Sequence, residues 1–141
     1  MTMDDYNELY DFWLSTPGMG LNDVDDSKEG IEKYLERNPD TCFIAIVSNK
    51  IVGVILSGHD GRRGYIYHAA VSVTCRNQGI GSALLNTALT ALRHEGITKV
   101  ALVVFKNNEI GNAFWEHRGF SLREDLNYRN KALIELKRID T

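Results

Sequence analysis

The sequence predicts an α+β fold, in which helices flank a mixed, mostly antiparallel sheet with a central parallel pair of strands. Two apolar β-type runs joined by a short turn indicate a hairpin. A long amphipathic helix lies between two further strand-like runs and therefore connects them in parallel. The 141 residues, of which 43% are hydrophobic and 25% charged, suit one domain with its own core.

The first 40 residues are predicted to form two helices. In Asp4–Leu14, apolar side chains recur on one helical face, and the Pro and Gly residues of 16–20 end this segment. A second helix is expected to begin at Asp26, whose carboxylate can cap it, with Glu29 at the capping-box position. Asn38-Pro39 is expected to end it.

Three β-type segments follow, at Cys42–Val47, Ile51–Ser57 and Tyr65–Val73. The short turn at 48–50 and the glycine-containing turn at 59–64 connect them. Consecutive strands joined by such short turns are expected to pair antiparallel.

The second half begins with a predicted helix over Gly79–His94, which has a continuous apolar stripe. Lys99–Phe105 is a nearly continuous apolar run and is expected to form a strand covered on both faces. The remaining predicted elements are a helix at Glu109–His117 and two final strands, around Phe120–Leu122 and Ala132–Leu136.

Composition excludes several function classes. No apolar run approaches the roughly 18 residues of a membrane span. Two unclustered cysteines indicate a reducing compartment, so we expect a cytoplasmic protein. The four histidines show no metal-ligand spacing, and we expect no metal. A net charge of −3 without a basic stripe argues against nucleic acid as a partner.

Charge is distributed unevenly along the chain. Residues 1–40 carry eleven acidic and three basic side chains, a net charge of −8, whereas residues 41–141 carry a net charge of +5. One interpretation is a solvated acidic face. The other is that one part of the molecule binds a cation and the other an anion.

A glycine-containing turn precedes the long helix and reads Thr74-Cys-Arg-Asn-Gln-Gly-Ile-Gly-Ser82. Gly79 and Gly81 allow the backbone to approach a bulky anion, and the helix N-terminus attracts negative charge. A dinucleotide fingerprint would require a third glycine at Leu84, and the Gly-Lys-Ser/Thr of a P-loop is absent. The two remaining interpretations are a phosphate site and a turn shaped by its glycines.

The segment Arg76-Asn-Gln-Gly-Ile-Gly81 resembles the Arg/Gln-x-x-Gly-x-Gly/Ala signature of the GCN5-related N-acetyltransferases (GNAT). The upstream Ala69-x-Val71, the downstream Asn108 and the later Gly119-Phe120 fit the same family. The resemblance implies one N-acetyltransferase domain over residues 1–141, with the family's first edge strand missing. Either that strand is dispensable here, or the recorded start lies downstream of the true one.

The resemblance implies direct transfer of an acetyl group from acetyl-CoA, as co-substrate, to a primary amine of a small molecule or a protein. The alternative is a non-catalytic acyl-CoA-binding or regulatory module. The reason is that Trp115 occupies the position where the family commonly has a tyrosine that acts as the acid for the leaving thiolate. Trp115 could stack beside the pantetheine arm or be a core aromatic. The implied cofactor-binding residues are Ala69, Val71, Arg76, Asn77, Gln78, Gly79, Gly81, Ser82, Asn108 and Trp115.

No general base follows from the sequence, and the candidates are Tyr65, Tyr67 and His68. Period-two alternation places Tyr65 and Tyr67 on the side of Ala69 and Val71. His68 should then point to the opposite face, unless a β-bulge interrupts the strand.

The family builds its acceptor pocket partly from the first two helices and their loop. The implied substrate-binding residues are Trp13, Asp23, Asp25 and Tyr128, since aromatic rings beside carboxylates suit a cationic amine. Asp26 lies in the same loop and is either part of this pocket or only a helix cap. The expected partner is thus an amine substrate, without nucleic acid or membrane. Both a monomer and a homodimer fit the sequence.

Overall fold

The computed structural model describes residues 1–139. Two short 3₁₀ helices are labelled η. Along the described chain the order is η1 (Met3–Asp5), α1 (Tyr6–Leu14), β1 (Leu21–Asn22), α2 (Lys28–Arg37), β2 (Phe43–Val47), β3 (Lys50–His59), β4 (Gly64–Val71), η2 (Val73–Cys75), α3 (Ile80–His94), β5 (Val100–Leu102), α4 (Glu109–His117) and β6 (Arg138–Ile139).

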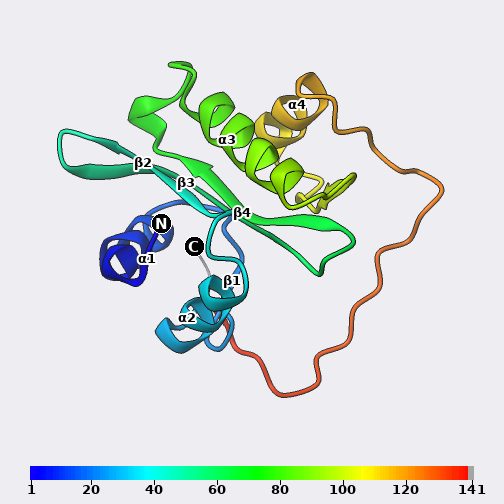
Figure 1. The fold of residues 1–141 in the computed structure, drawn as a ribbon, viewed down its shortest axis with the longest axis horizontal. Helices are drawn as coiled ribbons and strands as arrows, with labels where there is room; N and C mark the ends of the chain where they lie inside the picture. The colour runs from blue at the N-terminus through cyan, green and yellow to red at the C-terminus, as the bar shows by residue number, and fades with distance from the viewer. Residues whose placement is uncertain (140–141) are drawn as a thin grey trace.

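The main sheet has the strand order β2-β3-β4-β5 (Figure 1). β3 pairs antiparallel with β2 and β4, while β4 and β5 are parallel. Ser48 and Asn49 both have positive φ, as a two-residue hairpin turn requires. The predicted α+β class and mixed sheet are confirmed.

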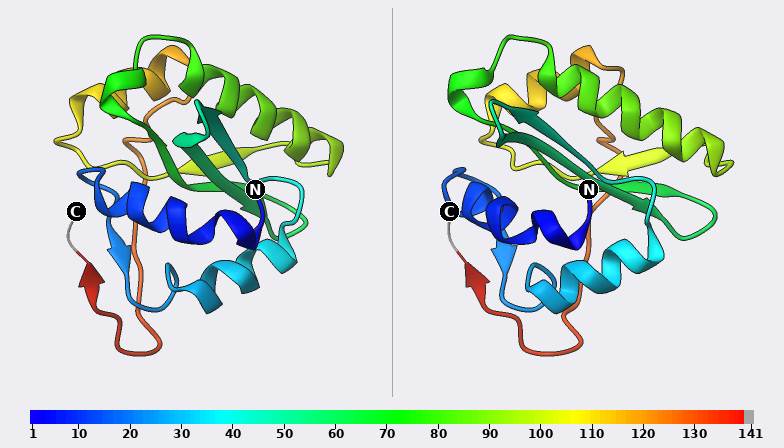
Figure 2. Two further views of the ribbon diagram at one scale, coloured as in Figure 1. Left: turned by 90° about the vertical axis from the view of Figure 1, so that its left-hand side faces the viewer. Right: turned by 60° about the vertical axis from the view of Figure 1, so that its left-hand side comes forward.

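Helices cover both faces of this sheet. α1 and α2 lie on one face, and α3 and α4 on the other (Figure 2). β3 lies between two strands. Its Val54 and Leu56 side chains pack on the face covered by α1 and α2, and Ile55 packs on the face covered by α3 and α4. The core therefore has two parts, separated by the sheet.

Strands β4 and β5 separate beyond their third residue pair. Their pairing runs from Gly64↔Val100 to Ile66↔Leu102, whereas β4 continues to Val71. The rest of this edge of β4 has no neighbouring strand among the described residues. The crossover helix α3 begins close to the open end, which positions the site described below.

Two local predictions are wrong. Ser27 caps α2 in place of Asp26, because its Oγ accepts a hydrogen bond from Gly30 N–H at 3.1 Å, and Glu29 is then not at the capping-box position. β5 is shorter than predicted and is not covered on both faces, because Val100 and Leu102 pack on the α3 side while Ala101 between them is exposed. Val103 and Phe105, just beyond it, are 56% and 47% exposed.

The two strands predicted around Phe120–Leu122 and Ala132–Leu136 are also wrong. Residues 120–137 contain no strand and run around the molecule as an extended segment (Figure 1). Short apolar runs flanked by charged residues need a neighbouring strand to be stable, and Leu122 and Leu133 are instead 82% and 91% exposed. The segment ends in β6, which pairs antiparallel with β1.

No strand precedes α1 in the described chain. Among residues 1–139, no helix combines the length and apolar composition needed to cross a membrane.

Candidate active site

A cavity of about 1390 Å³ opens where β4 and β5 separate. It is lined from the loop after α1, from α2, from β4 and the segment after β5, from α4 and from the C-terminal segment. Representative lining residues are Met19, Asp26, Tyr67, His68, Val104 and Trp115.

A β-bulge in β4 decides which side chains face α1 and α2. His68 pairs with Leu56 and Ile66 with Ser57, so Tyr67 is an extra residue in β4. Such an insertion interrupts the alternation of side chains. Tyr67 and His68 consequently lie on one side of the sheet, against Tyr34 of α2 and Trp13 of α1 respectively.

The predicted division of β4 side chains is therefore wrong. Tyr65 and Tyr67 do not share a side with Val71, which packs on the α3 side of the sheet. His68 lies on the same side as the two tyrosines and is brought to the cavity. The bulge is the physical reason.

His68 is paired with Asp26. Its Nε2 lies 2.6 Å from Asp26 Oδ1, and the two side chains are 11% and 5% exposed. Asp26, expected either in the acceptor pocket or only as a helix cap, does not cap α2 and lines the cavity. Its pairing with His68 is the feature that sequence reasoning missed. Trp13, expected to contact substrate, is fully buried instead, with its ring centroid 5.1 Å from that of His68.

Four tyrosines line one part of the cavity, namely Tyr34, Tyr65, Tyr67 and Tyr128. The rings of Tyr65 and Tyr67 are 4.6 Å apart. Burial is the largest cause that raises the pKa of both phenols, and Tyr128 adds to the shift. Both are therefore neutral hydrogen-bonding groups over the physiological range and unsuitable as bases.

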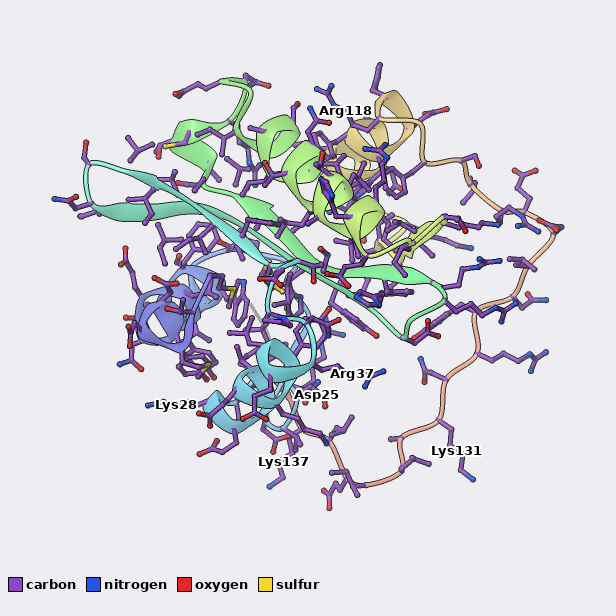
Figure 3. The ribbon with its side chains drawn as sticks, viewed as in Figure 1. Asp25, Lys28, Arg37, Arg118, Lys131 and Lys137 are labelled. Carbon is purple, nitrogen blue, oxygen red and sulfur yellow. The ribbon has the colours of Figure 1, made fainter. Side chains whose placement is uncertain are left out.

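The two acidic candidates beside α2 differ in environment. Asp25 lines the cavity, accepts a hydrogen bond from Asn22 Nδ2 at 3.0 Å and helps to raise the pKa of Tyr67. Figure 3 shows it beside α2, on the side of the sheet opposite Arg118. Asp23 does not line the cavity, because its carboxylate accepts the Lys137 N–H at 2.8 Å and secures the C-terminal segment.

The predicted glycine turn forms the N-terminus of α3. Asn77 and Gly79 have positive φ, and Gly79 is an N-cap residue without a side chain. Because the first intrahelical bond runs from Ala83 N–H to Gly79 C=O, the amides of residues 80–82 have no intrahelical acceptor. A Cβ at Gly79 would meet nothing within 4 Å, so this end of the helix is open.

The other residues of the turn have separate structural tasks. Arg76 Nε donates to Val71 C=O at 3.2 Å, and Gln78 Nε2 donates to Thr74 C=O at 3.4 Å. Ser82 lies in the first turn of α3. A Cβ at Gly81 would lie 3.4 Å from Phe114 and 3.5 Å from Val71, so this glycine allows close packing between α3, β4 and α4.

Two cofactor candidates come from α4, and both line the cavity. Asn108 Oδ1 caps this helix by accepting Gly111 N–H at 2.9 Å. Trp115 packs edge-on between Phe114 and Phe120. It is thus a partly buried core aromatic that also borders the cavity.

These features fit an anionic ligand such as acetyl-CoA. Three main-chain donors without intrahelical acceptors, at an open helix N-terminus, suit a pyrophosphate group. The free edge of β4 begins on the other side of the same turn. The described residues contain no group of three or more His, Cys, Asp or Glu side chains placed to hold a metal.

Comparisons with known proteins agree with this architecture. The family model described as "Acetyltransferase (GNAT) family" matches residues 6–120. Acetyltransferase SG1711 of Sodalis glossinidius is 30% identical over 132 residues, covering 94% of this chain and 92% of that protein.

Two solved structures share the fold. The PaiA N-acetyltransferase of Thermoplasma acidophilum, in complex with coenzyme A, has a TM-score of 0.71 at 16% identity, covering 84% of each chain. AAC(6')-Iy, in complex with a bisubstrate analogue, has a TM-score of 0.69 at 16% identity, covering 94% of this chain and 95% of that one. The chain belongs to the acetyltransferase (GNAT) family and is an N-acetyltransferase.

Proposed function

We propose that the protein transfers an acetyl group from acetyl-CoA directly to a primary amine in the cavity between β4 and β5. One observation carries the proposal: the uncapped amides at the α3 N-terminus lie beside the end of β4, where its free edge has no neighbouring strand among the described residues. An anion and an extended arm can be held there side by side. The coenzyme A of the PaiA complex supports the same co-substrate for this fold.

The pyrophosphate of acetyl-CoA would bind at the glycine turn. The amides of residues 80–82 supply donors in the direction of the helix dipole. Arg76 adds positive charge beside them, and Asn77 and Gln78 shape the turn before Gly79. Ser82 adds a hydroxyl donor in the first helical turn.

The thioester would lie along β4, near Ala69 and Val71. Ser72 N–H donates to Val52 C=O at 2.8 Å. Because residues in an antiparallel ladder alternate in direction, the main-chain groups of Ala69 and Val71 then point away from β3, toward the free edge. An amide donor at this edge stabilises the negative charge that develops on the carbonyl oxygen.

The amine would approach from the side of α2 and the tyrosines. Asp25 and the faces of Tyr65, Tyr67 and Tyr128 favour a cationic molecule. The bisubstrate analogue in AAC(6')-Iy is CoA-S-monomethyl-acetylneamine, whose acetylneamine part supports an amine acceptor here. Small molecules and protein amino groups both remain within this proposal.

Transfer forms one C–N bond and breaks one C–S bond. The amine nitrogen attacks the thioester carbon, and coenzyme A leaves as a thiolate. Asn108 and Trp115 border the arm on the α4 side, where the Trp115 indole can donate a hydrogen bond but not a proton. The departing thiolate therefore takes its proton from solvent.

The test is thiol release from acetyl-CoA with a panel of amines that includes polyamines, aminoglycosides, amino acids and peptides. We expect steady turnover with at least one of them, and a new acetamide by mass spectrometry. Binding of acetyl-CoA without turnover of any amine would contradict the proposal and favour a non-catalytic acyl-CoA module.

Two free cysteines and this co-substrate suit a cytoplasmic setting.

A further inference from the structure

The paired His68 and Asp26 are placed at the wall of the cavity. Both side chains line it, although each is largely buried, at 11% and 5% exposure. They belong to different layers, since His68 is in β4 and Asp26 lies in the loop before α2. The 2.6 Å contact between them joins the sheet to the loop that borders the acceptor side.

The carboxylate of Asp26 is held from several directions. Its Oδ2 accepts the Asn22 N–H at 2.7 Å, while its main-chain oxygen accepts the Tyr6 hydroxyl at 3.0 Å. The Trp13 ring packs against the imidazole of His68. Neither partner can therefore move far without disturbing α1 or the β1–α2 loop.

This contact determines the tautomer of the neutral imidazole. An ionised carboxylate only accepts hydrogen bonds, so the facing Nε2 must carry the proton. In a neutral ring, Nδ1 then has a free lone pair. Within residues 1–139, no hydrogen-bond partner occupies His68 Nδ1.

We propose that His68 accepts the proton of the attacking amine at Nδ1 and that Asp26 is its positioning residue, an inference that rests on the proposed transfer. As the C–N bond forms and the C–S bond breaks, the ammonium proton passes to Nδ1, directly or through one water. The imidazolium is balanced by Asp26 and later releases its proton to water. The products are the amide and coenzyme A thiol.

The position along β4 suits this task. His68 precedes Val71 by three residues, about 10 Å of extended strand. Its neighbour Ala69 begins the stretch proposed to bind the thioester. Tyr65 and Tyr67 border the same space, but burial raises the pKa of both and removes them as bases.

The first experiment compares His68→Gln with the wild type and with His94→Gln, which changes an exposed histidine at the far end of α3. The glutamine amide can still donate to Asp26 but cannot accept a proton. We expect kcat for the best amine to fall about 10²–10⁴-fold. The Kd of acetyl-CoA should stay within about twofold of the wild-type value, and the melting temperature within a few degrees of it. An unchanged kcat in a folded His68→Gln protein would overturn the proposal while leaving acetyl transfer intact.

The second experiment does not depend on activity. Long-range ¹H–¹⁵N correlation spectra of imidazole-labelled protein at neutral pH report the His68 tautomer. We expect a protonated Nε2 and an unprotonated Nδ1 in the wild type, and loss of this preference in Asp26→Asn. A protonated Nδ1 in the wild type, or a spectrum unchanged by Asp26→Asn, would overturn the proposal. Absence of turnover by the wild type would instead refute the proposed function.

Discussion

Gly79 allows a negative charge to be placed at the proposed phosphate site without filling it. The residue has φ +82 and open space around its Cβ direction, so a small side chain fits there. Asp and Asn tolerate left-handed backbone similarly. Gly79→Asp and Gly79→Asn therefore form a matched pair that differs by one charge.

The expected difference follows from Coulomb's law. A carboxylate at about 6 Å from one phosphate charge costs roughly 0.7–2.8 kcal/mol for effective dielectric constants of about 80 to 20. Coenzyme A should then bind Gly79→Asp roughly 3- to 100-fold more weakly than Gly79→Asn. Calorimetric titration with coenzyme A at low and high salt measures this difference, which salt should reduce.

The control is the stability of the two variants, which thermal unfolding compares in the absence of ligand. If the two variants melt at similar temperatures, the difference in their affinity for coenzyme A comes from ligand binding and not from folding. Equal affinities of the two folded variants for coenzyme A would refute the assignment of the phosphate groups to the α3 N-terminus.

Four further predictions concern other parts of the molecule. Asp25→Asn should raise the KM for a cationic amine several-fold with an unchanged Kd for coenzyme A, and an unchanged KM would remove Asp25 from the acceptor site. Asp23→Ala removes the carboxylate that accepts a main-chain amide near β6, so limited proteolysis should cut the C-terminal segment faster. Cleavage at the wild-type rate would contradict this. Gly58→Ala places a Cβ 2.5 Å from side-chain atoms of α2 and its C-cap. Urea unfolding should therefore show a free energy of unfolding lower by about 1–3 kcal/mol, and an unchanged midpoint would argue against this close packing. Burial raises the pKa of Cys42 to about 11, so its thiol stays protonated at pH 8, and iodoacetamide should label Cys75 first; equal rates in native protein would be inconsistent with that environment.

Sequence patterns predicted the elements whose signals are local. The turn between β2 and β3 and the bounds of α4 match the structure closely, because turn residues and helical periodicity act over a few positions. The glycine turn was likewise identified from its own residues. Its placement between a strand and a long helix follows from the order of neighbouring segments.

The structure departs from the sequence prediction where distant contacts decide. The bulge at Tyr67 changes the side on which His68 lies, and no residue type marks it in advance. Asp26 and His68 are 42 positions apart, so their pairing follows only from the fold. Residues 120–137 contain strand-like runs, but strand propensity alone does not form a strand without a partner.

Coenzyme A is proposed to bind at the N-terminus of α3 and along the free edge of β4. Amide chemical-shift mapping of the labelled protein during titration with coenzyme A tests this placement most directly. We expect the largest shifts at residues 78–82 and at Ala69 and Val71, with small shifts in α2. Saturable shifts confined to another part of the molecule would contradict it.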